Sequence, residues 1–134
     1  MRLQEFYSEN PGYAPLLITE GWQVAQLNTS REQRPENIGD LEKHMRTDET
    51  FTLLEGSAVL ITADEDGKNL ELTPMKAGRT YNVPRGIWHN IAMMEKTSVL
   101  ITENAGTHTE AKETRGLSEA SRKKIREVCA DYKK

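Results

Sequence analysis

The feature that most constrains the fold is a series of short segments rich in β-branched and aliphatic residues, separated by turn residues at regular spacing. Several of these segments alternate apolar and polar side chains, which is typical of half-buried strands. Asp66-Gly67 in the stretch 64–69 is a typical hairpin turn. The segments are 22–30, 41–47, 51–63, 70–75, 79–83, 87–95 and 97–104. Many short strands in this order predict an all-β sandwich or barrel.

The end of the chain has a different periodicity, which predicts a helix. Ser118 is a suitable helix cap, and the apolar residues that follow lie on one helical face. They are Ile125, Val128, Cys129 and Tyr132. We expect this helix over about 118–132, with Cys129 buried, beside a barrel core of about 20–105. A length of 134 residues suits a single domain over 1–134.

Composition limits the classes of partner and compartment. The net charge of −3 argues against nucleic-acid binding, which usually needs a basic domain. No apolar run approaches the ~20 residues of a membrane span. Residues 1–13 lack the apolar region of a signal peptide, and a single cysteine excludes an internal disulfide. We therefore expect a cytoplasmic protein that binds neither nucleic acid nor membrane.

Two of the three histidines lie where a barrel interior is expected. On the segment 87–95, His89 shares a face with Ile87, Ile91 and Met93, whereas Trp88 lies on the opposite face. A buried imidazole needs a hydrogen-bond partner or a metal ion. Residues two apart on a strand share a face, so Glu42 and His44 point the same way. Glu49 follows just before a strongly apolar strand, where an unpaired carboxylate would be costly.

Two motifs containing these residues resemble those of the cupin superfamily. "GRTYNVPRGIWHNIAM" matches the second cupin motif from Gly78 through Pro84 and Gly86 to His89. It departs from the motif at Met93, where the family has asparagine. "EKHMRTDETFTLLEG" matches the first motif at His44, Glu49 and Gly56, with Glu42 in place of the first histidine. The resemblance covers roughly residues 40–105.

The resemblance implies a double-stranded β-helix, the cupin jelly roll, and a divalent metal in the barrel. The positions that match metal-binding residues of the family are His44, Glu49 and His89. Two histidines and a carboxylate suit Fe, Mn, Ni or Zn with open positions for water or substrate. Glu42 is a fourth ligand, a partner of Arg46, or a catalytic acid/base.

The remaining candidates are assigned more ordinary roles. His108 lies in a polar segment after the last strand and is expected to be an exposed loop residue. Trp88 is expected to pack on the outer face of its sheet or at a subunit contact, and Arg85 to be a solvated turn residue. Tyr81, on the strand before the turn, is a candidate for the pocket lining.

Three functions remain open from the sequence. The first is a metal-dependent enzyme acting on a small polar metabolite, such as a sugar or small acid. The second is a module that binds a small ligand without turnover. The third is a structural homo-oligomer with a vestigial site, in which the trio is a hydrogen-bonded cluster without metal. A homodimer is expected, and the apolar segment 13–22 is a candidate strand for exchange between protomers.

Overall fold

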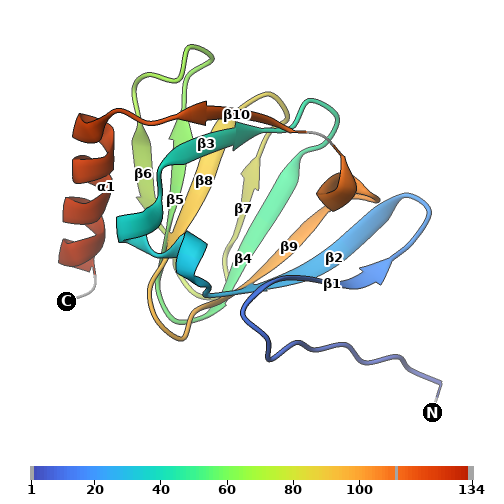
Figure 1. Cartoon of the computed structure of the whole chain (residues 1–134). Helices are drawn as coiled ribbons and strands as arrows, with labels where there is room; N and C mark the ends of the chain where they lie inside the picture. The colour runs from blue at the N-terminus through green and yellow to red at the C-terminus, as the bar shows by residue number, and fades with distance from the viewer. Residues whose placement is uncertain (1, 111, 133–134) are drawn as a thin grey trace.

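The computed structural model describes residues 2–110 and 112–132, which form two facing antiparallel sheets and one α-helix (Figure 1). The first sheet has the order β1(Gly12–Ile18), β2(Trp22–Asn28), β9(Ser98–Asn104), β4(Glu49–Glu55), β7(Thr80–Val83). The second has the order β10(Glu113–Gly116), β3(Asp40–Lys43), β8(Trp88–Met93), β5(Ala58–Ala63), β6(Glu71–Pro74). The expected all-β jelly roll with a C-terminal helix is confirmed.

The main core lies between the two sheets because alternate residues of each strand point inward. On β4 the buried positions are Glu49, Phe51 and Leu53, and the residues between them are less buried. On β8 the inward residues include Ile91 and Met93, both fully buried or nearly so. Burial of these aliphatic side chains is the main stabilising contribution to the barrel.

A second apolar cluster lies between the outer face of the second sheet and the helix α1(Glu119–Tyr132). Ile125 and Cys129 of α1 are buried there, together with Trp88 of β8. The Ser118 hydroxyl accepts a hydrogen bond from the Ser121 N–H at 3.1 Å, which caps the helix. At the other end of α1, the Tyr132 hydroxyl donates to the Met75 carbonyl at 2.6 Å. The predicted helix, its cap and the burial of Cys129 are therefore confirmed.

Short 3-10 helices lie in the connection between β2 and β3 and in the connection between β9 and β10. They are η1(Arg31–Gln33), η2(Pro35–Asn37) and η3(Thr107–Thr109). No helix in the described part of the chain is long and apolar enough to cross a membrane.

Three boundaries differ from the prediction. The strand expected over 41–47 ends at Lys43, because the chain turns there to cross from the second sheet to the first. The sheets extend beyond the expected core of 20–105, since β1 begins at Gly12 and β10 ends at Gly116. β1 pairs with β2 of the same chain, and the exchange of this segment between protomers stays a prediction.

Candidate metal centre

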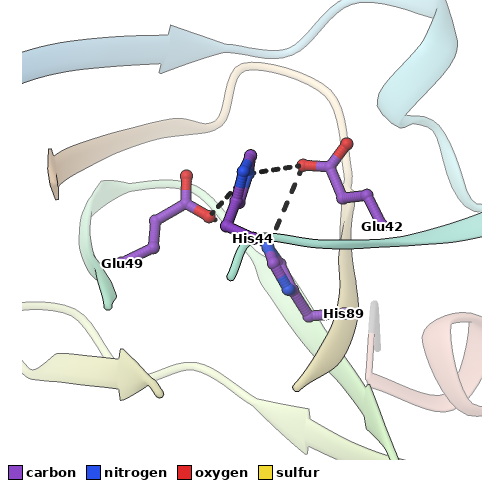
Figure 2. A group of neighbouring side chains, drawn as sticks. All are labelled: Glu42, His44, Glu49 and His89. Carbon is purple, nitrogen blue, oxygen red and sulfur yellow. Dashed lines mark hydrogen bonds and ion pairs between the residues drawn. The ribbon is translucent and has the colours of Figure 1, made fainter. Parts of the chain in front are cut away.

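Four side chains converge at one end of the space between the sheets (Figure 2). Each offers one ligand atom, and these four atoms all lie within 4.8 Å of one another. They belong to Glu42, His44, Glu49 and His89. Glu49 comes from the first sheet and Glu42 and His89 from the second, while His44 lies on the connection between them. The structure therefore brings together all four residues that the sequence singled out.

His89 is oriented by its own backbone neighbourhood. Its Nδ1 lies 2.9 Å from the carbonyl oxygen of Ile87, and because a carbonyl can only accept, Nδ1 carries the proton. Nε2 then points into the cluster, 2.9 Å from Oε1 of Glu49. A backbone carbonyl that holds one ring nitrogen while the other faces the centre is typical of metal-ligating histidines.

The turn before β8 links the two histidine-bearing segments. Gly86 has φ 81°, a conformation that glycine adopts without strain, and the Ile87 N–H closes the turn on the Pro84 carbonyl at 3.3 Å. The Gly86 N–H donates to the carbonyl oxygen of His44 at 2.7 Å. The turn therefore positions His89 and also ties down the backbone of the other histidine.

The connection that carries His44 to Glu49 is also held from outside. Asn104 donates two hydrogen bonds here: its backbone N–H donates to the Thr47 hydroxyl at 2.9 Å, and its side-chain amide donates to the Arg46 carbonyl at 2.9 Å. The Asp48 carboxylate accepts from the Arg85 N–H at 3.0 Å. These hydrogen bonds hold the connection between the two sheets in place. The site is therefore positioned by this connection as well as by the strands.

Glu42 lies opposite His89 on the neighbouring strand and is bound to a lysine that sequence reasoning missed. The Lys112 ammonium is 2.6 Å from Oε2 of Glu42, whereas Oε1 faces the histidines at 3.7 and 3.9 Å. Burial would raise the pKa of this carboxyl, but the nearby His44 imidazole and the Lys112 ammonium lower it to about 2. Glu42 is therefore ionised at neutral pH, and its partner is Lys112 rather than the Arg46 considered from the sequence.

The carboxylates shift the titration of both histidines. The nearby Glu42 carboxylate raises the pKa of His44 above its ordinary value, with a further contribution from Glu49. Burial lowers the pKa of His89, but the hydrogen bond and charge of Glu49 outweigh that effect and the pKa is raised. In the metal-free protein the neighbouring carboxylates therefore favour the protonated form of both imidazoles.

A cavity of about 890 Å³ opens beside the cluster and has a polar wall that the sequence reading missed. Glu103, on β9 and paired in register with Glu49, is only 6% exposed. The Tyr13 hydroxyl donates to its Oε2 at 3.1 Å. Burial and the Glu49 charge raise the pKa of Glu103 to about 7. Alternation on 97–104 places Glu103 on the inward face of Val99 and Ile101, which is the signal that could have identified it.

The other sequence candidates lie as follows. His108 is exposed, as expected, but it also lines the cavity, and its Nδ1 is 3.0 Å from the Gln23 amide nitrogen. The suggestion for Tyr81 is wrong: it packs against the core, where its hydroxyl accepts from the Lys76 N–H at 2.9 Å. Trp88 packs beneath the helix on the outer face, with its Nε1 donating to the Glu65 carbonyl at 2.9 Å. Arg85 is 64% exposed and lies near Asp48.

Solved structures with the same arrangement of sheets identify the fold. A cupin-2 domain protein of Shewanella frigidimarina matches with a TM-score of 0.53 and 21% identity, over 71% of this chain and 83% of that one. The protein has a cupin fold. A protein of Bacillus halodurans, BH2720, also matches this structure, with a TM-score of 0.57 and 18% identity, over 75% of each chain.

A larger protein among the structural matches contains manganese. It is the oxalate decarboxylase of Bacillus subtilis, described with Mn(II) centres, which matches with a TM-score of 0.54 and 19% identity. The match covers 72% of this chain but only 26% of that one. No protein-family model matches the sequence, and no curated protein does. The cupin resemblance read from the two motifs is thus confirmed at the level of the fold.

Proposed function

We propose that the protein binds one divalent transition-metal ion in the barrel. The observation that carries this proposal is the convergence of four ligand atoms within 4.8 Å at the head of a cavity. The ligands are His44, Glu49 and His89, with Glu42 as the fourth. Two imidazoles and two carboxylates form a mixed nitrogen and oxygen donor set, which suits Fe, Mn, Ni or Zn.

Glu42 acts in this proposal as a ligand rather than as the catalytic acid/base. Lys112 binds one of its oxygens and keeps the pKa of the carboxyl at about 2, so it holds no proton to give at neutral pH. Its other oxygen faces both histidines. The ammonium also offsets one negative charge of the donor set, which limits repulsion between Glu42 and Glu49.

The proposed activity is the conversion of a small polar metabolite at the metal. The bound ion would supply a Lewis acid toward a carbonyl, carboxylate or water oxygen. The cavity volume of about 890 Å³ is within the range of small-molecule sites, and its lining combines apolar residues with a few converging polar groups. The same features support a second candidate, a module that binds the metabolite without turnover.

Metal analysis tests the proposal directly. Protein purified without added metal, and then loaded with Mn²⁺, Fe²⁺, Ni²⁺ or Zn²⁺, is expected to hold about one ion per chain by elemental analysis. His44→Ala and His89→Ala are expected to lose it, whereas His108→Ala is the matched control outside the four-ligand cluster. A wild-type chain that takes up none of these ions would favour the vestigial site, a hydrogen-bonded cluster.

We also propose that the chain forms a homodimer. The support is the extended arm before β1, where Leu3, Phe6 and Tyr7 expose apolar side chains. The arm leaves from a fixed point, because the Ser8 backbone bonds to the buried Gln26 amide at 3.2 and 3.1 Å. Light scattering is expected to give twice the chain mass of 15.2 kDa. Replacing the three apolar side chains with serine is expected to give the monomer, and a wild-type monomer would contradict the proposal.

A further inference from the structure

Glu103 is a buried carboxylate without a cationic partner. Its side chain lies on β9 at the edge of the four-ligand cluster and lines the cavity. Within residues 2–110 and 112–132, no lysine, arginine or histidine nitrogen lies within 4.0 Å of its oxygens. The other carboxylates of the site do have such partners: Lys112 for Glu42, and His89 for Glu49. Burying the charged form of a carboxyl without a cationic partner is costly, and a cation supplied by a ligand would offset that cost.

A hydrogen-bond chain from neighbouring strands holds Glu103 in place. The Gly106 N–H donates to Oε1 of the fully buried Gln23 at 2.7 Å, which fixes the orientation of the Gln23 amide. Nε2 of Gln23 therefore donates to the Tyr13 hydroxyl at 2.9 Å and to Nδ1 of His108 at 3.0 Å. The Tyr13 hydroxyl accepts this hydrogen bond from Gln23 and donates its own hydrogen bond to Glu103. The chain of neutral donors positions the carboxylate but does not balance its charge.

The rest of the cavity is also acidic. The carboxylates that line it are Glu32, Asp40, Glu42, Glu49, Glu103 and Glu110. The basic residues of the lining are Arg31, Lys112, His44, His89 and His108; the lysine is already bound to Glu42, and His44 and His89 belong to the metal cluster. A divalent ion at the cluster would still leave the negative charges in excess. Such a cavity repels a dianionic ligand and attracts a cation, because the field is strongest inside a cleft with one sign of charge.

We propose that the cavity takes a small ligand carrying an ammonium group, with Glu103 as the counter-ion of that ammonium. The inference rests on the proposed function in one respect, since the oxygen atoms of the ligand would face the metal ion. The ammonium completes a charge-assisted hydrogen bond to a carboxylate that is already placed by Tyr13. Glu103 is not one of the four residues of the metal cluster, so the two contacts are made by different side chains.

Three ligands of the same carbon skeleton test the proposal by calorimetry on the Zn²⁺-loaded protein. Serinol carries an ammonium group where glycerol has its central hydroxyl, and tartronate has carboxylates at both ends. Serinol is expected to bind at least tenfold more tightly than glycerol, which corresponds to about 1.4 kcal/mol, and tartronate more weakly than serinol. In Glu103→Gln, which keeps the shape and removes the charge, the preference for serinol is expected to disappear.

Glu71→Gln is the matched control, because Glu71 is an exposed carboxylate on β6 away from the cavity. This variant is expected to keep the preference. The proposal is overturned if serinol fails to bind at about 10 mM, well above the weak end of specific affinity. It is also overturned if glycerol or tartronate matches serinol, or if Glu103→Gln keeps the preference.

The metal content of the same samples separates this inference from the proposed function. If the chain holds no ion, the proposed function fails, and the comparison of serinol with glycerol is repeated on the metal-free protein. If the ion binds and the preference for serinol is absent, the metal centre stands and the role of Glu103 as a counter-ion falls.

Discussion

The two faces of β8 are covered by different partners. Its outer face presents Trp88 and Ala92 to the helix α1, and Met94, directly after the strand, is buried with them in one apolar cluster. Its inner face begins with His89 at the metal centre and continues with Ile91 and then Met93 in the main core. The outer face is therefore apolar at these three positions, whereas the inner face changes from polar to apolar within a few residues.

The same gradient occurs on the neighbouring strands of the first sheet. Glu49 on β4 is followed on the same face by Phe51 and Leu53, and Glu103 on β9 is preceded by Val99 and Ile101. The polar residues gather at one end of the barrel and the apolar residues at the other. The apolar end of these strands therefore contributes mainly to stability, and the polar end contains the candidate metal centre. Substitutions can test whether a change at one end leaves the property of the other end unaffected.

The largest effect is expected from Met93→Asn, which places the asparagine of the cupin motif into the apolar end. Met93 is fully buried among aliphatic side chains, so the amide would lose packing and find few hydrogen-bond partners. We expect the free energy of unfolding of the metal-free protein to fall by about 2–5 kcal/mol. Urea denaturation followed by tryptophan fluorescence measures this change.

Metal content is the second measurement on Met93→Asn. Because the substitution lies away from the four ligand atoms, the folded variant is expected to keep about one ion per chain. A variant that is as stable as the wild type, or that is folded but metal-free, would show that the two ends of the barrel are not independent.

The next effect is expected at the polar end of the same face. His89→Ala removes a ligand and is expected to weaken Zn²⁺ binding by at least about 100-fold, more than typical losses from the groups that orient ligands. Competition with a fluorescent chelator measures the affinity. His108 lies on the cavity wall but outside the cluster, so the Zn²⁺ affinity of His108→Ala is expected to stay within about threefold of the wild type. An equal loss of affinity in both variants would show that His89 is not a ligand in any way that His108 is not.

Acidification is expected to have a smaller effect at the polar end. The neighbouring carboxylates raise the pKa values of His44 and His89 above 6.5, so protons compete with the metal there. Zn²⁺ affinity should fall as pH falls through these raised values, by up to about tenfold per unit for each proton displaced. In the metal-free chain, the stabilisation from both imidazolium groups is present below 6.5 and is lost as pH rises through the raised values. Chelator titrations and denaturation over this range measure both trends; affinity independent of pH would be contrary evidence.

The smallest effect is expected on the outer face. Trp88→Phe keeps an aromatic ring but removes the Nε1–H that donates to the Glu65 carbonyl, and it weakens the contact with the Lys43 ammonium 4.5 Å from the ring. We expect a loss of about 1 kcal/mol in the free energy of unfolding and no change in metal affinity. Thermal denaturation and chelator competition together check this expectation. A change in Zn²⁺ affinity would show that the outer face of β8 influences the metal centre on its inner face.

Much of this arrangement could be predicted from local sequence pattern. Alternation placed His89 and Trp88 on opposite faces, and motif spacing brought Glu42, His44 and Glu49 to the same centre. These predictions succeeded because strand period and turn residues act over a few positions. Helix capping at Ser118 is equally local.

The rest of the site depends on contacts between distant segments. Lys112 meets Glu42 only because β10 pairs with β3, a strand far from it in sequence. Tyr13 reaches Glu103 only because β1 pairs with β2, which in turn pairs with β9. Nothing in the local pattern near Tyr13 or Lys112 indicates the partner, so the polar wall was missed and Tyr81 was suggested instead.

The burial of Cys129 provides a way to measure how often the helix α1 separates from the second sheet. It is the only cysteine in the chain, and burial raises the pKa of its thiol to about 11. A thiol reagent therefore reacts with the folded protein only when α1 separates from the second sheet. Labelling rates with and without bound ligand would show whether a ligand in the barrel changes how often α1 separates from the second sheet, without any residue having to be replaced.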